Sequence, residues 1–195
     1  DKTAAQGKDY AFIDWWAHDR EQEKRAFEDF IDWVHARWSR DPGMHVYHYA
    51  SYEITAINKI ANREQTRLEQ VEELLARGVF VDLYRIVLNG LLIGEPRYSI
   101  KNVEHLYRKE RETEVANGGE SVVAYERWRE LGGEVKWRDT PEGLASWRTD
   151  AAGFQWAMWP ELKAIRDYNI DDCESTLELV EWLRRTQGGA GITYS

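Results

Sequence analysis

The sequence of 195 residues contains one cysteine, four prolines and no long hydrophobic run. The single thiol, Cys173, cannot form an internal disulfide, which is typical of a protein from a reducing compartment such as the cytoplasm. The longest apolar stretch, residues 86–93, is interrupted by Asn89 and Gly90. It falls far short of the roughly 20 apolar residues that cross a membrane. The sequence therefore predicts neither a disulfide scaffold nor a membrane segment.

Positive charge is also scarce, since 26 lysines and arginines face 35 acidic residues and leave a net charge of −9. This balance excludes a protein that coats phosphate backbones with its whole surface, so nucleic acid would have to be bound by a local basic face. Hydrophobic residues (43%) and charged residues (31%) are present in the proportions of an ordinary globular domain, not of a disordered chain. The chain begins at Asp1 without methionine or signal peptide, and we expect it to be a piece of a longer protein.

Strand-like and helix-like segments alternate along the chain. Residues 9–16, 45–49 and 79–83 have the aromatic, β-branched or continuously apolar composition of strands. Asp19 and Gln22 form a capping-box pattern ahead of the first helix. Further helical patterns cover residues 53–61, 68–75, 100–107, 161–168 and 173–185. This alternation predicts an α/β domain with helices packed on a largely parallel sheet.

The domain organisation follows from composition. Residues 1–9 are polar and predicted to be loose, and residues 187–195 form a glycine-containing tail that is predicted to be flexible. Residues 10–186 are predicted to form one domain. Within it, residues 117–160 are rich in tryptophan, lack periodicity and are interpreted as an insertion with a helix near 121–131.

Two acidic segments could carry chemistry. In the first, a strand ends near Tyr49 and a helix starts near Ser51, so Glu53 falls in the first helical turn. An acid at this position is also favourable simply because helix N-termini attract negative charge. In the second, Tyr168 and Asp172 stand four residues apart and can share one helix face. An aspartate at a helix start is equally consistent with routine capping.

Together these segments resemble a known family. The pattern His-Tyr-x-x-Tyr-Glu at 48–53, followed by Tyr-Asn-x-Asp-Asp-Cys at 168–173, is similar to the second and third motifs of the DEDD exonuclease superfamily. More closely, the chain resembles the RNase H-like (YprB-like) domain of predicted RecB-family nucleases, large bacterial proteins often fused to a helicase. The resemblance spans residues 15–183. Further matching segments are residues 16–19, 81–84, 98–101 and 121–125.

The resemblance implies an RNase H-like mixed sheet flanked by helices and a metal-dependent 3′-to-5′ exonuclease acting on single-stranded DNA or RNA ends. It implies that acidic side chains hold two Mg²⁺ or Mn²⁺ ions, which prefer oxygen ligands and assist phosphodiester cleavage. By position in the motifs, Glu53 and Asp172 are the metal ligands, and Tyr168 orients or activates the attacking water. Asp171 is either an outer acid of the site or a helix cap. Asp82 either lies near the metals or has a structural role.

The first motif of the superfamily, Asp-x-Glu on an opening strand, is missing. It normally lies ahead of the segment that resembles residues 12–16, and residues 1–10 contain no such pattern. We therefore expect the N-terminal strands and half of the metal site to be absent, and the isolated chain to cut weakly or not at all. The remaining ligands would come from a parent nuclease or nuclease-helicase, whose other domains are the expected partners. The alternative is a non-catalytic module that binds nucleic acid or docks neighbouring domains.

A local basic window offers candidate phosphate contacts. Residues 97–111 carry more basic than acidic side chains in an otherwise acidic chain. Arg97, Lys101, Arg108 and His48 are the predicted nucleic-acid contacts, and His48 is also predicted to lie beside the carboxylates. The same charge run could equally be an ordinary solvated helix face.

Overall fold

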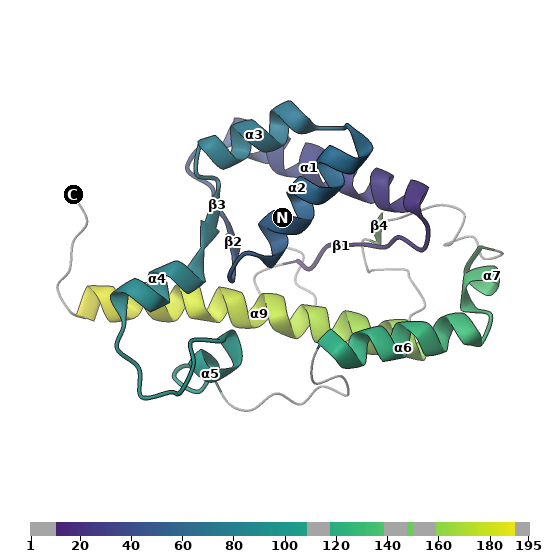
Figure 1. Ribbon diagram of the computed structural model, residues 1–195. Helices are drawn as coiled ribbons and strands as arrows, with labels where there is room; N and C mark the ends of the chain where they lie inside the picture. The colour runs from purple at the N-terminus through teal and green to yellow at the C-terminus, as the bar shows by residue number, and fades with distance from the viewer. Residues whose placement is uncertain (1–10, 109–117, 139–147, 150–158, 190–195) are drawn as a thin grey trace. The chain divides into compact units, whose positions relative to one another are not determined.

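The computed structural model (Figure 1) describes residues 11–108, 118–138, 148–149 and 159–189. The chain divides into two compact units. The first comprises Asp1–Phe30 and Thr113–Ile170, and the second comprises Ile31–Glu112 and Asp171–Ser195. Two helices, α1 (Arg20–Arg40) and α9 (Pro160–Gly189), contribute residues to both units. The predicted loose segment 1–9 lies outside the described residues, as do residues 190–195 of the predicted tail 187–195, whereas residues 187–189 are helical and belong to α9.

The second unit contains a parallel strand pair, as the alternation of segments predicted. β2 (Val46–His48) pairs with β3 (Phe80–Asp82) in a register that places His48 opposite Asp82. Gly78, with a φ of 68°, makes the turn that leads into β3, because glycine tolerates left-handed backbone at little cost. Since the two strands are parallel and in step, their carboxyl ends meet at the same edge.

The described part of the second unit also contains four short helices. They are α2 (Tyr52–Glu64), α3 (Leu68–Ala76), α4 (Leu83–Gly90) and α5 (Ile100–Glu104). Helix α4 was not predicted from the sequence, and its first residue, Leu83, was assigned to the preceding strand. Asp82 ends that strand because its side chain accepts a hydrogen bond from the amide of Tyr84 and caps α4.

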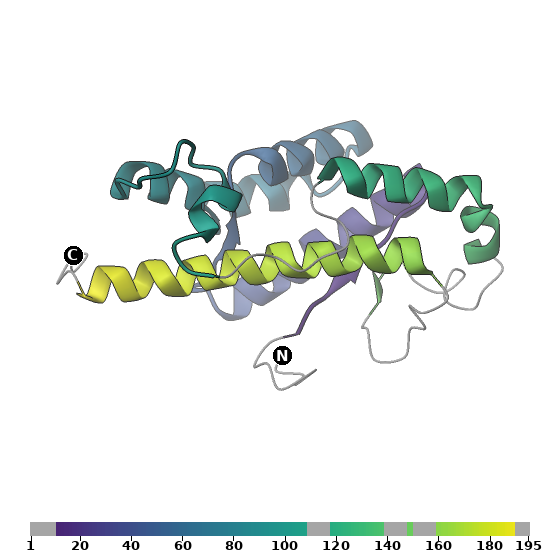
Figure 2. The same cartoon turned by 90° about the horizontal axis from the view of Figure 1, so that it is seen from below.

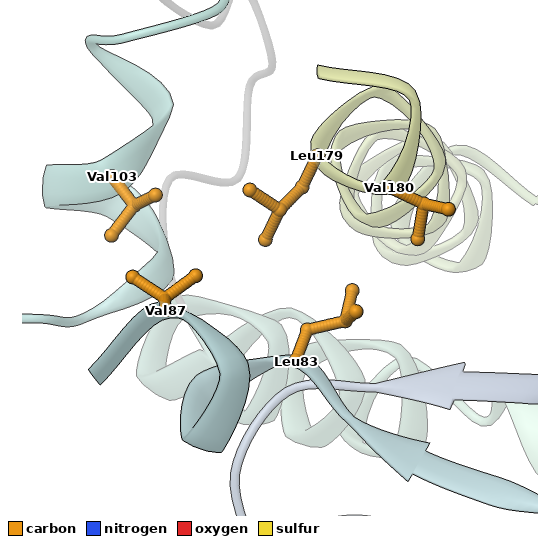
Figure 3. Packing of buried hydrophobic residues seen from close by; sticks show 5 residues of the cluster. All are labelled: Leu83, Val87, Val103, Leu179 and Val180. Carbon is orange, nitrogen blue, oxygen red and sulfur yellow. The ribbon is translucent and has the colours of Figure 1, made fainter. Parts of the chain in front are cut away.

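The hydrophobic core of the second unit joins three helices (Figure 3). Leu83 and Val87 of α4 pack with Val103 of α5 and with Leu179 and Val180 of α9. All five side chains are buried. Burying an aliphatic side chain of this size stabilises the fold by about 1.5–3 kcal/mol, so this cluster fixes the C-terminal part of α9 against α4 and α5.

The C-terminal helix corrects one sequence interpretation. The sequence predicted two helices separated by a junction at 169–172, whereas α9 continues without a break from Pro160 to Gly189. No proline or glycine interrupts it before Gly188, and proline suits the first turn of a helix. Asp171 and Asp172 therefore lie within a helix and not at its start, so Asp171 is not a helix cap.

The first unit contains a second, antiparallel pair and an aromatic core. β1 (Asp14–Trp15) pairs with β4 (Arg148–Thr149). The predicted helix near 121–131 is present as α6 (Gly118–Glu130), and α7 (Gly133–Arg138) follows it. Figure 2 shows α6 alongside the first turns of α9, where Arg127 lies 3.9 Å from Glu161.

Tryptophans from the predicted insertion build this core. Trp128, Trp137 and Trp159 are buried together with Leu162 of α9. At the entrance to α1, the Gln22 amide donates to Asp19 Oδ1 over 2.8 Å, which confirms the predicted capping box. The described part of the chain is thus a mixed α/β structure, mostly helical, with smaller sheets than the sequence predicted.

Candidate active site

The candidate site lies at the carboxyl ends of β2 and β3, within the second unit. Asp82 organises this edge because its Oδ1 accepts two backbone hydrogen bonds, from Ala50 N at 2.9 Å and from Tyr84 N at 3.0 Å. One bond fixes the loop after β2, and the other caps α4. Asp82 therefore has a structural role at the position where the sequence left two alternatives.

His48 holds the same loop from the other side. Its ring is 8% exposed, and its Nδ1 lies 2.7 Å from the carbonyl oxygen of Ala50. Because a carbonyl only accepts, His48 Nδ1 donates the proton of this hydrogen bond. Ala50 has a φ of 66°, a conformation that costs a non-glycine residue about 1 kcal/mol or more. Bonds to both its amide and its carbonyl hold it there, and they set where α2 begins.

Glu53 stands in the first turn of α2, as predicted, with 47% of its side chain exposed. Its pKa is raised above the ordinary value, first by desolvation and then by the negative charges of Asp82 and Asp172. Its own backbone amide and His48, whose Nδ1 is 3.8 Å from Glu53 Oε2, act in the opposite direction. Carboxylates from three elements, α2, β3 and α9, thus lie close enough to affect one another.

The acidic side chains near Glu53 also affect the thiol of Cys173. Desolvation raises the pKa of its thiol to about 11, and Asp172, Glu174 and Glu53 add to the shift. A thiol with this pKa is neutral near pH 7, so Cys173 is no nucleophile at that pH.

The other predicted site residues are placed as follows. Tyr168 precedes Asp172 by four residues in the unbroken helix α9, where such positions share one face. Asp171 accepts a hydrogen bond from Arg108, whose Nη2 is 2.7 Å from Asp171 Oδ1. A second acid, Glu178, lies 3.2 Å from Arg108 Nε. The structure therefore brings Asp171 together with Arg108, and the charge of Asp172 contributes to the raised pKa of Glu53.

The predicted phosphate contacts do not form one described cluster. Arg97 and Lys101 are exposed, before and within α5. Arg108 is engaged by two acids, and His48 is buried. The rest of the window, Lys109 and Arg111, lies outside the described residues. Binding of nucleic acid by these side chains stays a prediction.

The donors present fit a divalent cation in their chemistry. The described ranges contain no group of three or more His, Cys, Asp or Glu side chains that could hold a metal ion. Glu53 and Asp172 nevertheless supply carboxylate oxygens, the ligands that Mg²⁺ and Mn²⁺ prefer. Desolvation first, and then the charges of Asp82 and Asp172, raise the pKa of Glu53, and a bound cation would favour its charged form. These two acids can provide part of a ligand set.

Sequence reasoning missed Arg85. This residue lies in the first turns of α4, with its Nε 3.7 Å from Asp82 Oδ2 and 79% of its side chain exposed. The sequence does contain a signal for helix α4, which carries Arg85, since an aspartate N-cap followed by Leu83 and Val87 is typical of a helix start. The left-handed Ala50, by contrast, has no sequence signature, because alanine rarely adopts that backbone.

The fold and the site define a mixed α/β domain with an acidic edge at the ends of two parallel strands. A family model described as RNase_H superfamily (RNase_H_2) matches residues 3–184. The chain belongs to this family, which confirms the RNase H-like relationship predicted from the motifs and indicates a nuclease-like fold. Searches among curated proteins and among solved structures found no match. Among the described helices, none is both long and apolar enough to cross a membrane.

Proposed function

We propose that this chain is a metal-dependent nuclease domain of the DEDD type, a 3′-to-5′ exonuclease acting on single-stranded DNA or RNA ends. One observation carries the proposal. Glu53 lies 3.8 Å from His48, the last residue of β2, and the charge of the sequence-distant Asp172 adds to desolvation and to Asp82 in raising the pKa of Glu53. Family membership over residues 3–184 supports it.

The proposed roles follow from this arrangement. Glu53 and Asp172 hold Mg²⁺ or Mn²⁺, which supplies an activated water and charge stabilisation at the phosphate when it is bound. Tyr168, one helical turn before Asp172, orients the attacking water. Asp82 and His48 hold the loop that positions Glu53.

We further propose that the domain works within a larger bacterial nuclease or nuclease-helicase of the YprB-like, RecB-related kind, in DNA repair. The motifs at 48–53 and 168–173 support this relationship. Residues 1–10 carry no Asp-x-Glu pattern. We therefore expect low activity from these 195 residues, and higher activity when a parent segment with that motif is joined ahead of them.

A cleavage assay tests the proposal. A single-stranded oligonucleotide labelled at its 5′ end is incubated with Mn²⁺ and either the 195-residue chain or the chain joined to an Asp-x-Glu segment. We expect shortening from the 3′ end that is abolished in Asp172→Asn and Glu53→Gln. Glu181→Gln, an exposed acid on the same helix, is the matched control and should cut like the wild type. Unchanged cleavage by Asp172→Asn would remove this site from the chemistry.

One observation favours a second candidate, a non-catalytic module that binds nucleic acid or docks a neighbouring domain. The part of the chain that the structure describes holds no group of three metal-ligating side chains. Such a module would bind the oligonucleotide equally well with Mn²⁺ or with a chelator, and Asp172→Asn would leave both binding and the length of the oligonucleotide unchanged.

A further inference from the structure

We propose that Arg108 is a positioning residue for Asp172, which it fixes by clamping helix α9, and not a contact to nucleic acid. This inference rests on the proposed function of the acidic site, because it assigns the residue that sets the orientation of one of its two acids. It reverses the role that the sequence suggested for Arg108.

The clamp has two points of attachment on α9. Arg108 donates from Nη2 to Asp171 Oδ1 over 2.7 Å and from Nη1 to the backbone carbonyl of Asp171 over 3.2 Å. Its Nε lies 3.2 Å from Glu178 Oε2. Asp171 and Glu178 are seven residues apart, so they lie two turns apart on the same helix face. Charge-assisted bonds from a planar guanidinium fix direction as well as distance.

A buried polar network lies between these two points. Ser175, which is fully buried, donates a hydrogen bond to Glu104 Oε1, and Glu104 is 6% exposed. The Tyr107 hydroxyl lies 2.9 Å from the Ser175 hydroxyl. The α9 face that contains Asp171, Ser175 and Glu178 is thus bound to residues 104–108. Leu179, next along the helix, enters the core with Val103 (Figure 3).

This attachment sets the direction of Asp172. Successive residues of an α-helix are rotated by about 100° from each other, so fixing the face of Asp171 also fixes the neighbouring face of Asp172. That neighbouring side chain is close enough to Glu53 for its charge to be felt there. A helix that is free to rotate would misplace the carboxylate, and a misplacement of about 1 Å can reduce catalysis about 100-fold.

The same contacts argue against phosphate binding by Arg108. Only 15% of its side chain is exposed, and its guanidinium lies between two carboxylates. To bind a phosphate, Arg108 would have to break its bonds to Asp171 and Glu178. Arg97, by contrast, is exposed.

Steady-state cleavage kinetics, measured on the chain joined to the Asp-x-Glu segment, distinguish the two roles. For Arg108→Gln we expect kcat to fall about tenfold or more, with KM for the oligonucleotide and its salt dependence unchanged. Arg108→Lys should restore only part of kcat, because a lysine ammonium group cannot reproduce the several directed bonds of the planar guanidinium. Arg185→Gln, an exposed arginine on the same helix, is the control and should behave like the wild type. A rise in KM with a salt slope reduced by about one would instead establish a phosphate contact and overturn the proposal.

Hydrogen exchange of the whole chain provides a test that does not need activity. Arg108→Gln should exchange faster over the α9 residues from Asp171 to Glu178, with α2 and α3 unchanged. If the wild type neither cuts nor binds Mn²⁺, the proposed function fails while exchange still decides whether Arg108 clamps the helix. If the wild type cuts and Arg108→Gln keeps its kcat, the positioning role fails and the proposed function stands.

Should Arg108→Gln not fold, Glu178→Gln removes one attachment only. An intermediate loss of kcat at constant KM then supports the clamp, and a wild-type kcat overturns it.

Discussion

Asp82 illustrates how one side chain can serve several elements at once. Its carboxylate binds the Ala50 amide, caps α4 at Tyr84 and lies near Glu53. The sequence could show that an acid follows a strand here, but not which backbone groups it binds. The choice of partners depends on the left-handed turn at Ala50, whose amide is bound by Asp82 and whose carbonyl is bound by His48.

Removing this side chain should destabilise the second unit. Asp82→Ala leaves two backbone amides without their acceptor, so we expect the free energy of unfolding to fall by about 2 kcal/mol. Asp82→Asn keeps a carbonyl oxygen as acceptor and should lose about half as much. Urea denaturation measures both values. A loss below about 0.5 kcal/mol in Asp82→Ala would show that these bonds do not hold the edge.

His18 makes the first unit sensitive to acid. Its ring lies among aromatic side chains, with centroids 4.6 Å from Trp128 and 5.0 Å from Trp137, and Nδ1 is 2.9 Å from the Tyr125 hydroxyl. Desolvation lowers its pKa to about 4, against the smaller raising effects of Glu134 and Asp19. The folded protein therefore binds a proton less readily than the unfolded chain, whose histidines titrate near 6.5.

The sign of the pH dependence follows from linkage. Above about pH 6.5 both states have a neutral His18 and the contribution is fully present. As pH falls from about 6.5 to about 4 the unfolded state takes up the proton first, and up to about 3 kcal/mol is lost. Denaturation across this range should show a weaker pH dependence in His18→Gln than in wild type, while His45→Gln, an exposed histidine, should follow the wild type. Identical slopes in all three proteins would contradict a buried neutral His18.

At the scale of elements, periodicity predicted most of the helices and both strands of the parallel pair. Phe27, Ile31 and Val34 fall on one face of α1 in the sequence and are buried in the structure. Helix α4 and the continuity of α9 could not be predicted in the same way. Asn and Asp at 169–172 are typical of helix starts because their side chains compete for backbone amides. In α9 a distant residue, Arg108, binds Asp171, and spacing does not reveal such a contact.

One substitution tests the continuity of α9, because it should change the free energy of unfolding in opposite directions for an unbroken helix and for two separate helices. In the middle of a helix, exposed Asn169 is a weak helix former, so Asn169→Ala should raise the free energy of unfolding by about 0.5 kcal/mol. If a second helix began at this point, the same change would remove an N-cap and lower it by about 1 kcal/mol. Thermal and urea denaturation give the sign directly, and a loss of stability would contradict the unbroken helix.

At the scale of the whole molecule, a net charge of −9 stands beside membership of the RNase H superfamily. An acidic chain with an acidic site repels a polyanion unless the site first gains positive charge. The sequence predicted Glu53 and Asp172 because short motifs mark them. It left a structural role for Asp82 as one of two alternatives, and it did not predict the contacts of Ala50 and Arg108, which join distant segments.

Binding of Mn²⁺ is the most direct test of the central claim, that Glu53 and Asp172 form a divalent-cation site. Calorimetric titration of the 195-residue chain should detect weak Mn²⁺ binding, which stabilises the folded state and strengthens when the chain is joined to an Asp-x-Glu segment. Asp172→Asn and Glu53→Gln should each weaken it by about tenfold or more, because each removes a charged oxygen ligand. Glu181→Gln should bind like the wild type. Equal affinity in all four proteins, or no binding in any of them, would contradict the account.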